Sequence, residues 1–333
     1  MGKTSASDYV IIDLCSGLGT LSLAASGLGM EPIAGVDINP YAIKTFSQNF
    51  PQAIGVLGDV ANKDTINKCE EHRQKYCNRK LLIVSGPPCQ GFSVAGSRDV
   101  NDPRNDVMVE VAKAVVKLNP DCALLENVSA ILSERNSPKI KKTLRILKNG
   151  GYNVYPFILN ALNYGVPQRR IRAIFFVTKI ELNAEELKLV FKSLERSPIT
   201  VGDALRDLPK PKVRPDEYLD EKDCGLVYNH FTMQHSEKVI KKIKALKPGT
   251  GPLSYRRLDL TSHSNTLISG HRAPPAHPTE ARSITVREAA RLQGIPDSVK
   301  IWGPFSKQME QVTNAVPLPL GMISLEVLLK ALN

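Results

Sequence analysis

The sequence predicts an α/β protein: a mostly parallel sheet with helices on both faces, and a smaller, irregular domain beside it. Apolar segments alternate with amphipathic segments up to about residue 180, which is the pattern of strand–helix–strand units. A glycine-containing turn follows the first strand, as in sheets that bind nucleotides. Residues 195–283 are instead rich in Pro, Gly, Ser, Thr and basic residues. We therefore assign residues 1–180 and 305–333 to a large domain and residues 181–304 to a small one.

The strands of the large domain are short apolar runs bounded by turn residues. They are predicted at residues 9–14, 33–36, 54–57, 81–85, 122–125, 154–159 and 173–177. The intervening helices carry apolar residues on one face, with Pro40 at one start and Gly150-Gly151 after one end. They are predicted at residues 21–26, 40–49, 105–118 and 139–148. Later helices are predicted at residues 239–246, at 285–293 with a cap near Ser283, and at 318–332.

The composition is that of a globular protein with a basic surface. The 333 residues are 42% hydrophobic and 23% charged, and the net charge of +11 favours a polyanionic partner. No apolar run approaches the roughly 20 residues that span a bilayer, and the N-terminus lacks a secretory signal, so we expect an intracellular protein without a membrane partner. The six cysteines show no paired framework, and Cys69, His72 and Cys77 lack a second ligand pair at zinc spacing. We expect free thiols and no metal site.

Residues at three strand ends predict an adenosine pocket. The turn Asp13-Leu14-Cys15-Ser16-Gly17-Leu18-Gly19-Thr20 joins the first strand to its helix, and its glycines let the backbone approach a ligand. Asp37, after the second strand, can accept hydrogen bonds from both ribose hydroxyls, and Asp59, after the third, can meet an adenine edge. The pocket alone does not separate S-adenosylmethionine (SAM) from NAD. However, Ser22 stands where G-x-G-x-x-G has its third glycine.

A reactive cysteine is predicted in Gly86-Pro87-Pro88-Cys89-Gln90-Gly91-Phe92-Ser93, after the fourth strand. Two prolines stiffen the chain and remove two N–H donors. They hold Cys89 in a fixed direction at the carboxyl edge of the sheet, where ligands bind. The alternative is a small buried thiol, which the loop-like flanks disfavour.

Two charged motifs follow. Glu126, in Leu124-Leu125-Glu126-Asn127-Val128, is a carboxylate at an apolar strand end, where desolvation can make it a proton donor. The alternative is a helix cap or a salt bridge. In Gln168-Arg169-Arg170-Ile171-Arg172, strand alternation would place Arg170 and Arg172 on one face, with a solvated charge cluster as the alternative.

Six motifs, taken in this order, resemble the cytosine-5 DNA methyltransferase family. They lie at residues 13–20, 86–93, 126–128, 168–172, 287–297 and 314–317, so the likeness covers most of the chain. The length resembles the compact bacterial enzymes of restriction–modification systems. The resemblance implies a Rossmann-like SAM-dependent methyltransferase domain with a target-recognition domain. It implies methylation of carbon 5 of a flipped-out cytosine in a specific duplex DNA sequence.

The resemblance also implies roles for single residues. Cys89 matches the nucleophile that adds to C6, Glu126 the acid that contacts N3 and the exocyclic amine, and Arg172 the arginine that reaches O2, with Arg170 nearby. The residues that would line the SAM pocket are Leu14, Cys15, Ser16, Gly17, Leu18, Asp37, Ile38, Asp59, Val60, Pro87, Asn314, Ala315 and Val316. The family pattern usually has Phe at Cys15 and Gly at Thr20 and Thr313, so an aromatic contact to SAM would be lost at Cys15.

DNA contacts are expected from two regions. Gln90, Ser93 and Arg98 belong to a loop that would close over the DNA, and Arg256 and Arg257 to the variable stretch of residues 181–284. Sequence-independent phosphate contacts are expected from five lysines around the helix of that stretch: Lys238, Lys241, Lys242, Lys244 and Lys247. The resemblance further implies a cognate restriction endonuclease that acts on the same site without direct contact. It implies a cytoplasmic, nucleoid-associated location in a prokaryote or a phage.

Three other functions fit the sequence less well. A tRNA-directed relative would typically carry Cys-Phe-Thr in the variable stretch, but Cys224 is followed by Gly225-Leu226. A nicotinamide-dependent oxidoreductase would leave Cys89 and Glu126 unexplained. An inactive DNA-binding relative is disfavoured because Cys89, Glu126 and Arg172 are all present.

Overall fold

A computed structural model describes residues 5–88, 106–134, 137–213, 227–252, 255–268 and 274–333. The chain forms two compact units. Unit 1 comprises Met1–Asn160, Ile171–Glu195 and Leu318–Asn333, and unit 2 comprises Ala161–Arg170 and Arg196–Pro317. These bounds differ from the predicted domains in three places. Residues 161–170, predicted in the large domain, belong to unit 2, where Gln168–Arg169 pairs with Ser264–Asn265. Residues 181–195 join unit 1 because the helix there packs on the C-terminal helix, and residues 305–317 join unit 2 because their helix packs on the one before it.

Unit 1 is built on a seven-stranded sheet in the order β3-β2-β1-β4-β5-β8-β6. The strands are β1 (Tyr9–Leu14), β2 (Glu31–Asp37), β3 (Ile54–Leu57), β4 (Lys80–Ser85), β5 (Cys122–Val128), β6 (Asn153–Asn160) and β8 (Ile171–Thr178). Strands β1 to β5 pair in parallel, whereas β8 runs antiparallel to both β5 and β6. The predicted mostly parallel α/β fold is confirmed.

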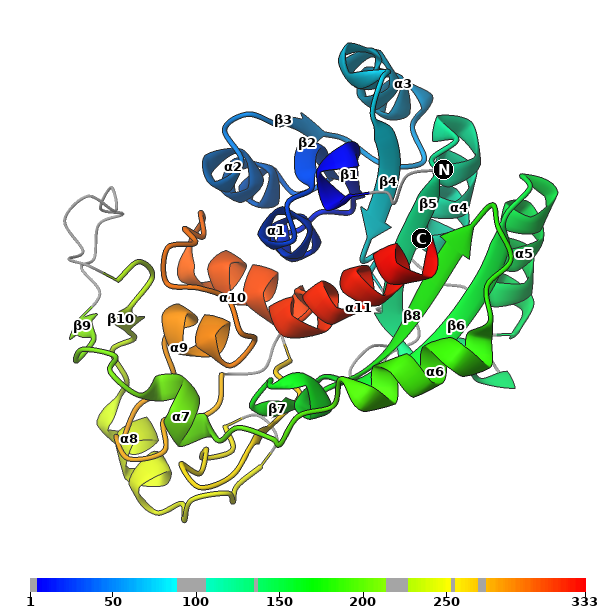
Figure 1. Ribbon diagram of the computed structural model, residues 1–333. Coiled ribbons are helices and arrows are strands. Elements are labelled where there is room, and N and C mark those ends of the chain that lie inside the picture. The colour runs from blue at the N-terminus through cyan, green and yellow to red at the C-terminus, as the bar shows by residue number, and fades with distance from the viewer. Residues whose placement is uncertain (1–4, 89–105, 135–136, 214–226, 253–254, 269–273) are drawn as a thin grey trace. The chain divides into compact units, whose positions relative to one another are not determined.

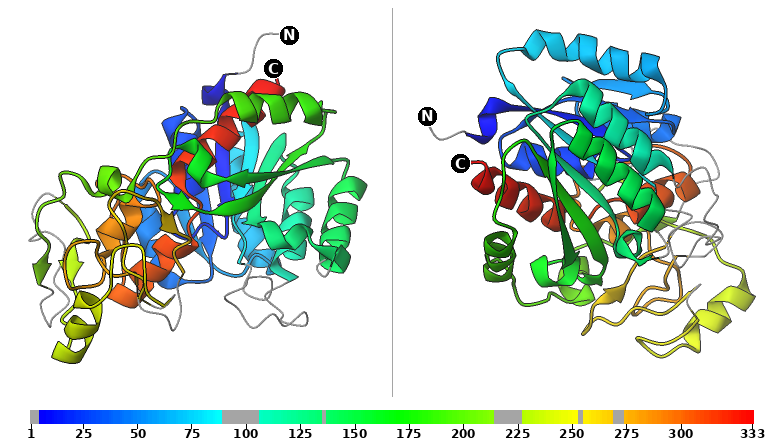
Figure 2. Two further views of the ribbon diagram at one scale, coloured as in Figure 1. Left: turned by 90° about the horizontal axis from the view of Figure 1, so that it is seen from below. Right: turned by 90° about the vertical axis from the view of Figure 1, so that its right-hand side faces the viewer.

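Helices cover both faces of this sheet (Figures 1 and 2). They are α1 (Thr20–Gly27), α2 (Pro40–Asn49), α3 (Lys63–Arg73), α4 (Val107–Leu118), α5 (Ser137–Asn149), α6 (Ala184–Ser193) and α11 (Leu318–Ala331). Helices α3, α4 and α5 bury their apolar residues in one core with the strands. Helices α1, α6 and α11 pack on the opposite face. The carboxyl ends of the parallel strands therefore form an edge between two helical layers.

Short polar signals fix the ends of several helices. Asn39 accepts a hydrogen bond from the Tyr41 N–H at the start of α2, where Pro40 occupies the first position. Asn62 and Asn183 cap α3 and α6 in the same way. These caps explain why α2 has the predicted bounds, since both of its start signals are readable in the sequence.

An aromatic cluster attaches α6 to the sheet. Phe191 lies 5.2 Å from Phe157 and 5.8 Å from Phe176, measured between ring centroids. Helix α6 was not predicted, although its cap Asn183 and its buried residues Leu187 and Phe191 stand in the sequence.

Unit 2 contains little regular structure among its described residues. Its helices are α7 (Val201–Leu205), α8 (Glu237–Lys244), α9 (Val286–Arg291) and α10 (Phe305–Asn314), and its strands are β7 (Gln168–Arg169), β9 (Lys212–Val213), β10 (Phe231–Thr232) and β11 (Ser264–Asn265). The predicted cap of α9 near Ser283 is wrong. Thr285 is the cap, and it forms a capping box with Glu288.

Buried polar side chains substitute for regular structure in unit 2. Arg287 is fully buried and donates to the backbone carbonyls of Tyr228, Pro296 and Val299. Tyr228 is far in the sequence from Pro296 and Val299, so one guanidinium joins two segments of the irregular chain.

One helical stretch, Phe305–Ala331, is long and apolar enough to cross a bilayer, but 72% of its most apolar window is buried inside the protein. Its apolar residues therefore serve packing, as in the core helices of globular proteins.

Candidate active site

The loop between β1 and α1 has an unusual backbone. Cys15, Gly17 and Gly19 all have positive φ, at 60°, 55° and 87°. Glycine adopts this conformation without strain, whereas Cys15 bears a side chain there. A Cβ atom on Gly19 would lie 2.8 Å from the Phe50 ring, so the position also requires glycine sterically. The glycines thus shape the turn, as the motif predicted.

The loop is tied to the end of β2. The Ser16 N–H donates to the Val36 carbonyl at 2.8 Å, and the Gly17 N–H donates to Asp37 Oδ2 at 2.8 Å. Asp37 Oδ1 accepts the Asn39 N–H at 2.9 Å. These bonds hold the Asp37 carboxylate rigidly at the sheet edge.

Apolar and polar surfaces meet beside that carboxylate. The Ile38 side chain is 69% exposed, although it is large and apolar. Asp59 is exposed after β3 and accepts the Ala61 N–H at 2.8 Å, and Val60 is buried beside it. An exposed aliphatic side chain between two carboxylates can pack on a flat base while the carboxylates bind hydroxyl and amine groups.

The remaining loop residues could contact a ligand through their backbone atoms and through one side-chain hydroxyl. Leu14 and Leu18 are fully buried, so a ligand would meet their backbone atoms only. The Ser16 Oγ is buried and has no hydrogen-bond partner among the residues that the structure describes. Burial raises the pKa of the Cys15 thiol, and the negative charge of Asp37 adds to this effect. Cys15 is therefore neutral, and Ser16 presents an unsatisfied polar atom that a ligand could pair.

The turn that precedes Cys89 is held by the next strand. Asn127 is buried, and its Nδ2 donates to the Pro87 carbonyl at 3.3 Å, while its Oδ1 accepts the Val128 N–H. The motif containing Asn127 was recognised in the sequence, but this contact was not predicted. Cys89 itself, with Gln90, Ser93 and Arg98, lies outside the described residues.

Glu126 and Arg172 form a buried ion pair on adjacent strands. Arg172 Nε lies 2.7 Å from Glu126 Oε1, and the two side chains are only 10% and 8% exposed. Glu126 was predicted to lie at a strand end, but β5 continues beyond it to Val128. The salt bridge, weighed as the alternative for Glu126, is present, and it lies one strand away from the Pro87 turn.

Arg170 and Arg172 have different partners. Arg170 lies between β7 and β8, outside both strands, so the alternation argument does not apply to it. It is buried in unit 2, and its Nη2 donates to the Ala315 carbonyl at 3.0 Å. The predicted cofactor residues Asn314, Ala315 and Val316 also lie in unit 2, at the end of α10.

The two arginines predicted to bind DNA differ in availability. Arg257 donates from Nε to the Pro278 carbonyl at 2.9 Å and from Nη1 to the Leu246 carbonyl at 3.0 Å. It thereby anchors the segment after α8, which is a structural role. Arg256 is exposed. The four lysines of α8 and Lys247, which follows the helix, are exposed as well.

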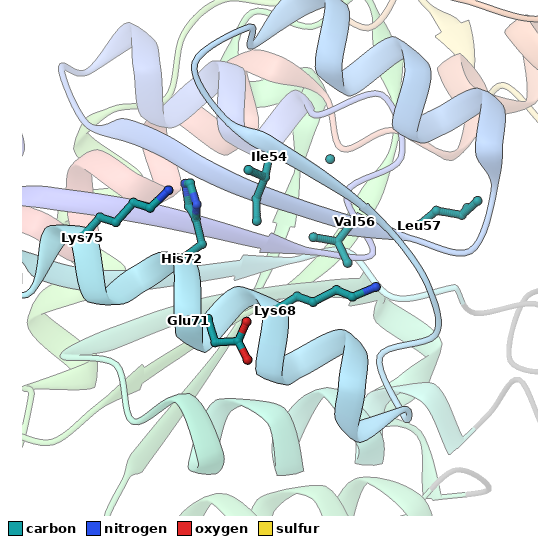
Figure 3. Close-up of a pocket in the computed structure, with 8 residues that line it drawn as sticks. Ile54, Val56, Leu57, Lys68, Glu71, His72 and Lys75 are labelled. Atoms are coloured by element: carbon teal, nitrogen blue, oxygen red, sulfur yellow. The ribbon is translucent and has the colours of Figure 1, made fainter.

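A cavity of about 580 Å³ lies elsewhere in unit 1, along the sheet edge between β3 and α3 (Figure 3). Lys68 and His72 of α3, with Lys75 in the turn that follows it, line the cavity opposite Ile54 and Val56. Its described lining includes none of the predicted site residues. The candidate site is therefore defined by the strand ends and not by this cavity.

A parallel sheet with a glycine turn after β1 and an acid after β2 is the architecture of α/β enzymes that bind an adenosine cofactor. The family model for C-5 cytosine-specific DNA methylases matches residues 9–330. The chain belongs to this family, and the resemblance drawn from its motifs is confirmed.

Relatives and solved structures agree with this assignment. The chain is 30% identical to the Type II methyltransferase M1.HphI of Haemophilus parahaemolyticus, over 96% of this chain and 86% of that protein. It is 30% identical to M.Eco47II of Escherichia coli, over 96% and 78%. An E. coli structure described as a candidate DNA modification methyltransferase encoded within a prophage matches with a TM-score of 0.78 and 28% identity, over 98% and 99% of the two chains. The S. pombe Dnmt2 methyltransferase, at 18% identity and a TM-score of 0.65, shows likeness of fold alone.

Proposed function

We propose that this protein transfers the methyl group of SAM to carbon 5 of a cytosine in a specific duplex DNA sequence, with Cys89 as the nucleophile. The observation that carries the proposal is the buried Glu126–Arg172 pair, one strand away from the Asn127–Pro87 contact that precedes Cys89. A carboxylate and a guanidinium held side by side match the polar edge of a cytosine, which offers N3, an amine and O2.

The strand ends of unit 1 suit the proposed cofactor. Asp37 and Asp59 would bind the ribose and the adenine, Ile38 would pack on the base, and the buried Ser16 Oγ would gain a partner. SAM would supply the methyl group. We assign Asn314, Ala315 and Val316 to the same pocket on the family resemblance.

The reaction proposed for the protein residues is covalent catalysis. The Cys89 thiolate adds to cytosine C6, which moves an electron pair into the ring and makes C5 nucleophilic. Glu126 is ion-paired with Arg172 before the base enters, so the proposed reaction requires Glu126 to take up a proton when the base binds. Its hydrogen bond to N3 then stabilises the charge that builds up in the ring, while Arg172 orients O2. After C5 is methylated, a base removes the C5 proton and Cys89 leaves. Because C6 is inaccessible within the stack, the cytosine must be flipped out at a cost of a few kcal/mol.

The proposed setting is a restriction–modification system. The relatives named as Type II methyltransferases support it, because each matches over nearly the whole chain. We propose duplex DNA as the partner, with a cognate endonuclease that acts on the same sequence without direct contact. A cytoplasmic, nucleoid-associated location in a prokaryote or a phage follows from that setting.

The proposal is tested by trapping the covalent adduct. Duplex DNA with 5-fluorocytosine at the target should form a stable adduct with the wild-type protein, because fluorine cannot leave C5 as a proton does. Cys89→Ala should abolish both the adduct and methyl transfer, whereas Cys77→Ala, which changes an exposed free cysteine, should change neither. Methyl transfer by Cys89→Ala would contradict the nucleophile assignment. Equal methylation of tRNA and duplex DNA would contradict the proposed substrate.

A further inference from the structure

A buried carboxylate lies beneath the cofactor loop. Asp13 is 1% exposed and lies in β1, between Gly35 of β2 and Val84 of β4. Its Oδ2 accepts a hydrogen bond of 2.8 Å from Ser22 Oγ, and Ser22 is fully buried in the first turn of α1. Within the described parts of the chain, no Lys, Arg or His forms an ion pair with Asp13. The carboxyl group therefore depends on neutral donors of Ser22, which are its hydroxyl and its backbone N–H.

This hydrogen bond closes the loop that would hold the cofactor. Asp13 precedes the three positive-φ residues Cys15, Gly17 and Gly19, and Ser22 follows them. Other ties of the loop run to β2, through Val36 and Asp37, and to β4, where the Ser85 hydroxyl donates to the Leu14 carbonyl at 2.6 Å. The Asp13–Ser22 bond is thus a direct side-chain link between the strand and the helix that flank the loop.

Stability alone is a poor reason for an acid at this position. Burial raises the pKa of Asp13 to about 7, and the negative charge of Asp37 adds to the increase. Ionised Asp13 therefore costs folding free energy, whereas Asn could accept the same bond from Ser22 more cheaply. What Asp13 contributes to the loop is therefore an acceptor oxygen and not a negative charge.

We propose that Asp13 and Ser22 are positioning residues that set the affinity for SAM by fixing the backbone of residues 14–21. The inference rests on the proposed function. Ser22 occupies the place of the third glycine of G-x-G-x-x-G, where a dinucleotide site brings the helix close to the strand. In this protein a serine hydroxyl provides that attachment.

The test is a double-mutant cycle on the full-length protein, with SAM binding measured by calorimetry. Asp13→Ala and Ser22→Ala should each weaken SAM binding by at least roughly fivefold, since one buried hydrogen bond contributes about 1 kcal/mol. The double variant should lose no more than Asp13→Ala alone, because that change already removes the bond to the Ser22 hydroxyl. Asp13→Asn, which retains an acceptor, should remain within about threefold of wild type. The matched control is Ser26→Ala, an exposed serine in the same helix, which should bind like wild type.

Hydrogen exchange separates positioning from general destabilisation. Ser22→Ala should accelerate amide exchange in residues 14–21 and leave β4 unchanged. A lower melting temperature with unchanged SAM affinity would overturn the inference, as would fully additive losses in the double variant. Absence of SAM binding by the wild-type protein would instead contradict the proposed function itself.

Discussion

The Glu126–Arg172 pair provides a quantitative test of the candidate site. Its 2.7 Å separation and side-chain exposures of 10% and 8% make it a buried ion pair. Breaking such a pair by removing one partner typically costs about 3–5 kcal/mol, because the remaining charge stays buried. Arg172→Ala should therefore destabilise the protein by about this amount, which corresponds to a melting temperature lower by about 4–7 °C for a chain of this size.

Two further variants make the interpretation specific. Replacing both partners by neutral side chains of similar size, as in Glu126→Gln with Arg172→Met, should recover most of the loss, because no buried charge remains. Lys330→Ala is the matched control, since Lys330 pairs with Glu326 on α11 at the same 2.7 Å while the side chains are 61% and 40% exposed. That control should cost less than about 1 kcal/mol.

Thermal unfolding followed by circular dichroism, with ligand absent, measures all of these variants. Our reasoning would be refuted if Arg172→Ala cost no more than Lys330→Ala, because burial would then not govern the pair. It would equally fail if the double variant were less stable than Arg172→Ala. In either case the site would lack the desolvated pair on which the proposed recognition of cytosine depends.

Three further outcomes are expected. Asn127→Ala should reduce methyl transfer at least tenfold while the melting temperature falls only modestly, because the Pro87 carbonyl loses its hydrogen bond and the turn before Cys89 is no longer held. Unchanged activity in a radiolabel assay would contradict this. Gly19→Ala should destabilise the protein by about 1–3 kcal/mol and weaken SAM binding, because its φ is 87° and the new Cβ would meet Phe50 at 2.8 Å; urea unfolding and calorimetry test both effects. For Asp13, the pKa of about 7 in the folded protein exceeds the ordinary value of 3.8, so its contribution to stability falls as pH rises from about 4 to 7. Asp13→Asn should therefore gain on the order of 4 kcal/mol relative to wild type between pH 4 and pH 8, and parallel urea titrations with a constant difference would contradict this.

Local signals in the sequence were enough to locate most elements of unit 1. Helix α2 has the predicted bounds because Asn39 and Pro40 mark its start within the segment itself. The loop from Asp13 to Thr20 was predicted as a tight turn because its glycines permit positive φ. Such features depend on neighbours only a few residues away, so the sequence determines them directly.

Contacts between distant segments were decided by the tertiary structure. Strand periodicity gives the face on which Glu126 lies, but only the antiparallel pairing of β5 with β8 brings Arg172 beside it. In the same way, a recognised motif did not reveal that Asn127 supports Pro87, and a basic residue such as Arg257 proved to anchor its own chain.

The family, the strand ends and the candidate nucleophile were therefore determined by the sequence, because motifs and short-range periodicity carry them. Their partners were determined only by the fold. A hydrogen bond such as that between Ser22 and Asp13 depends on how a strand and a helix pack around a loop. Burial then determines how much the hydrogen bond contributes to the free energy of folding.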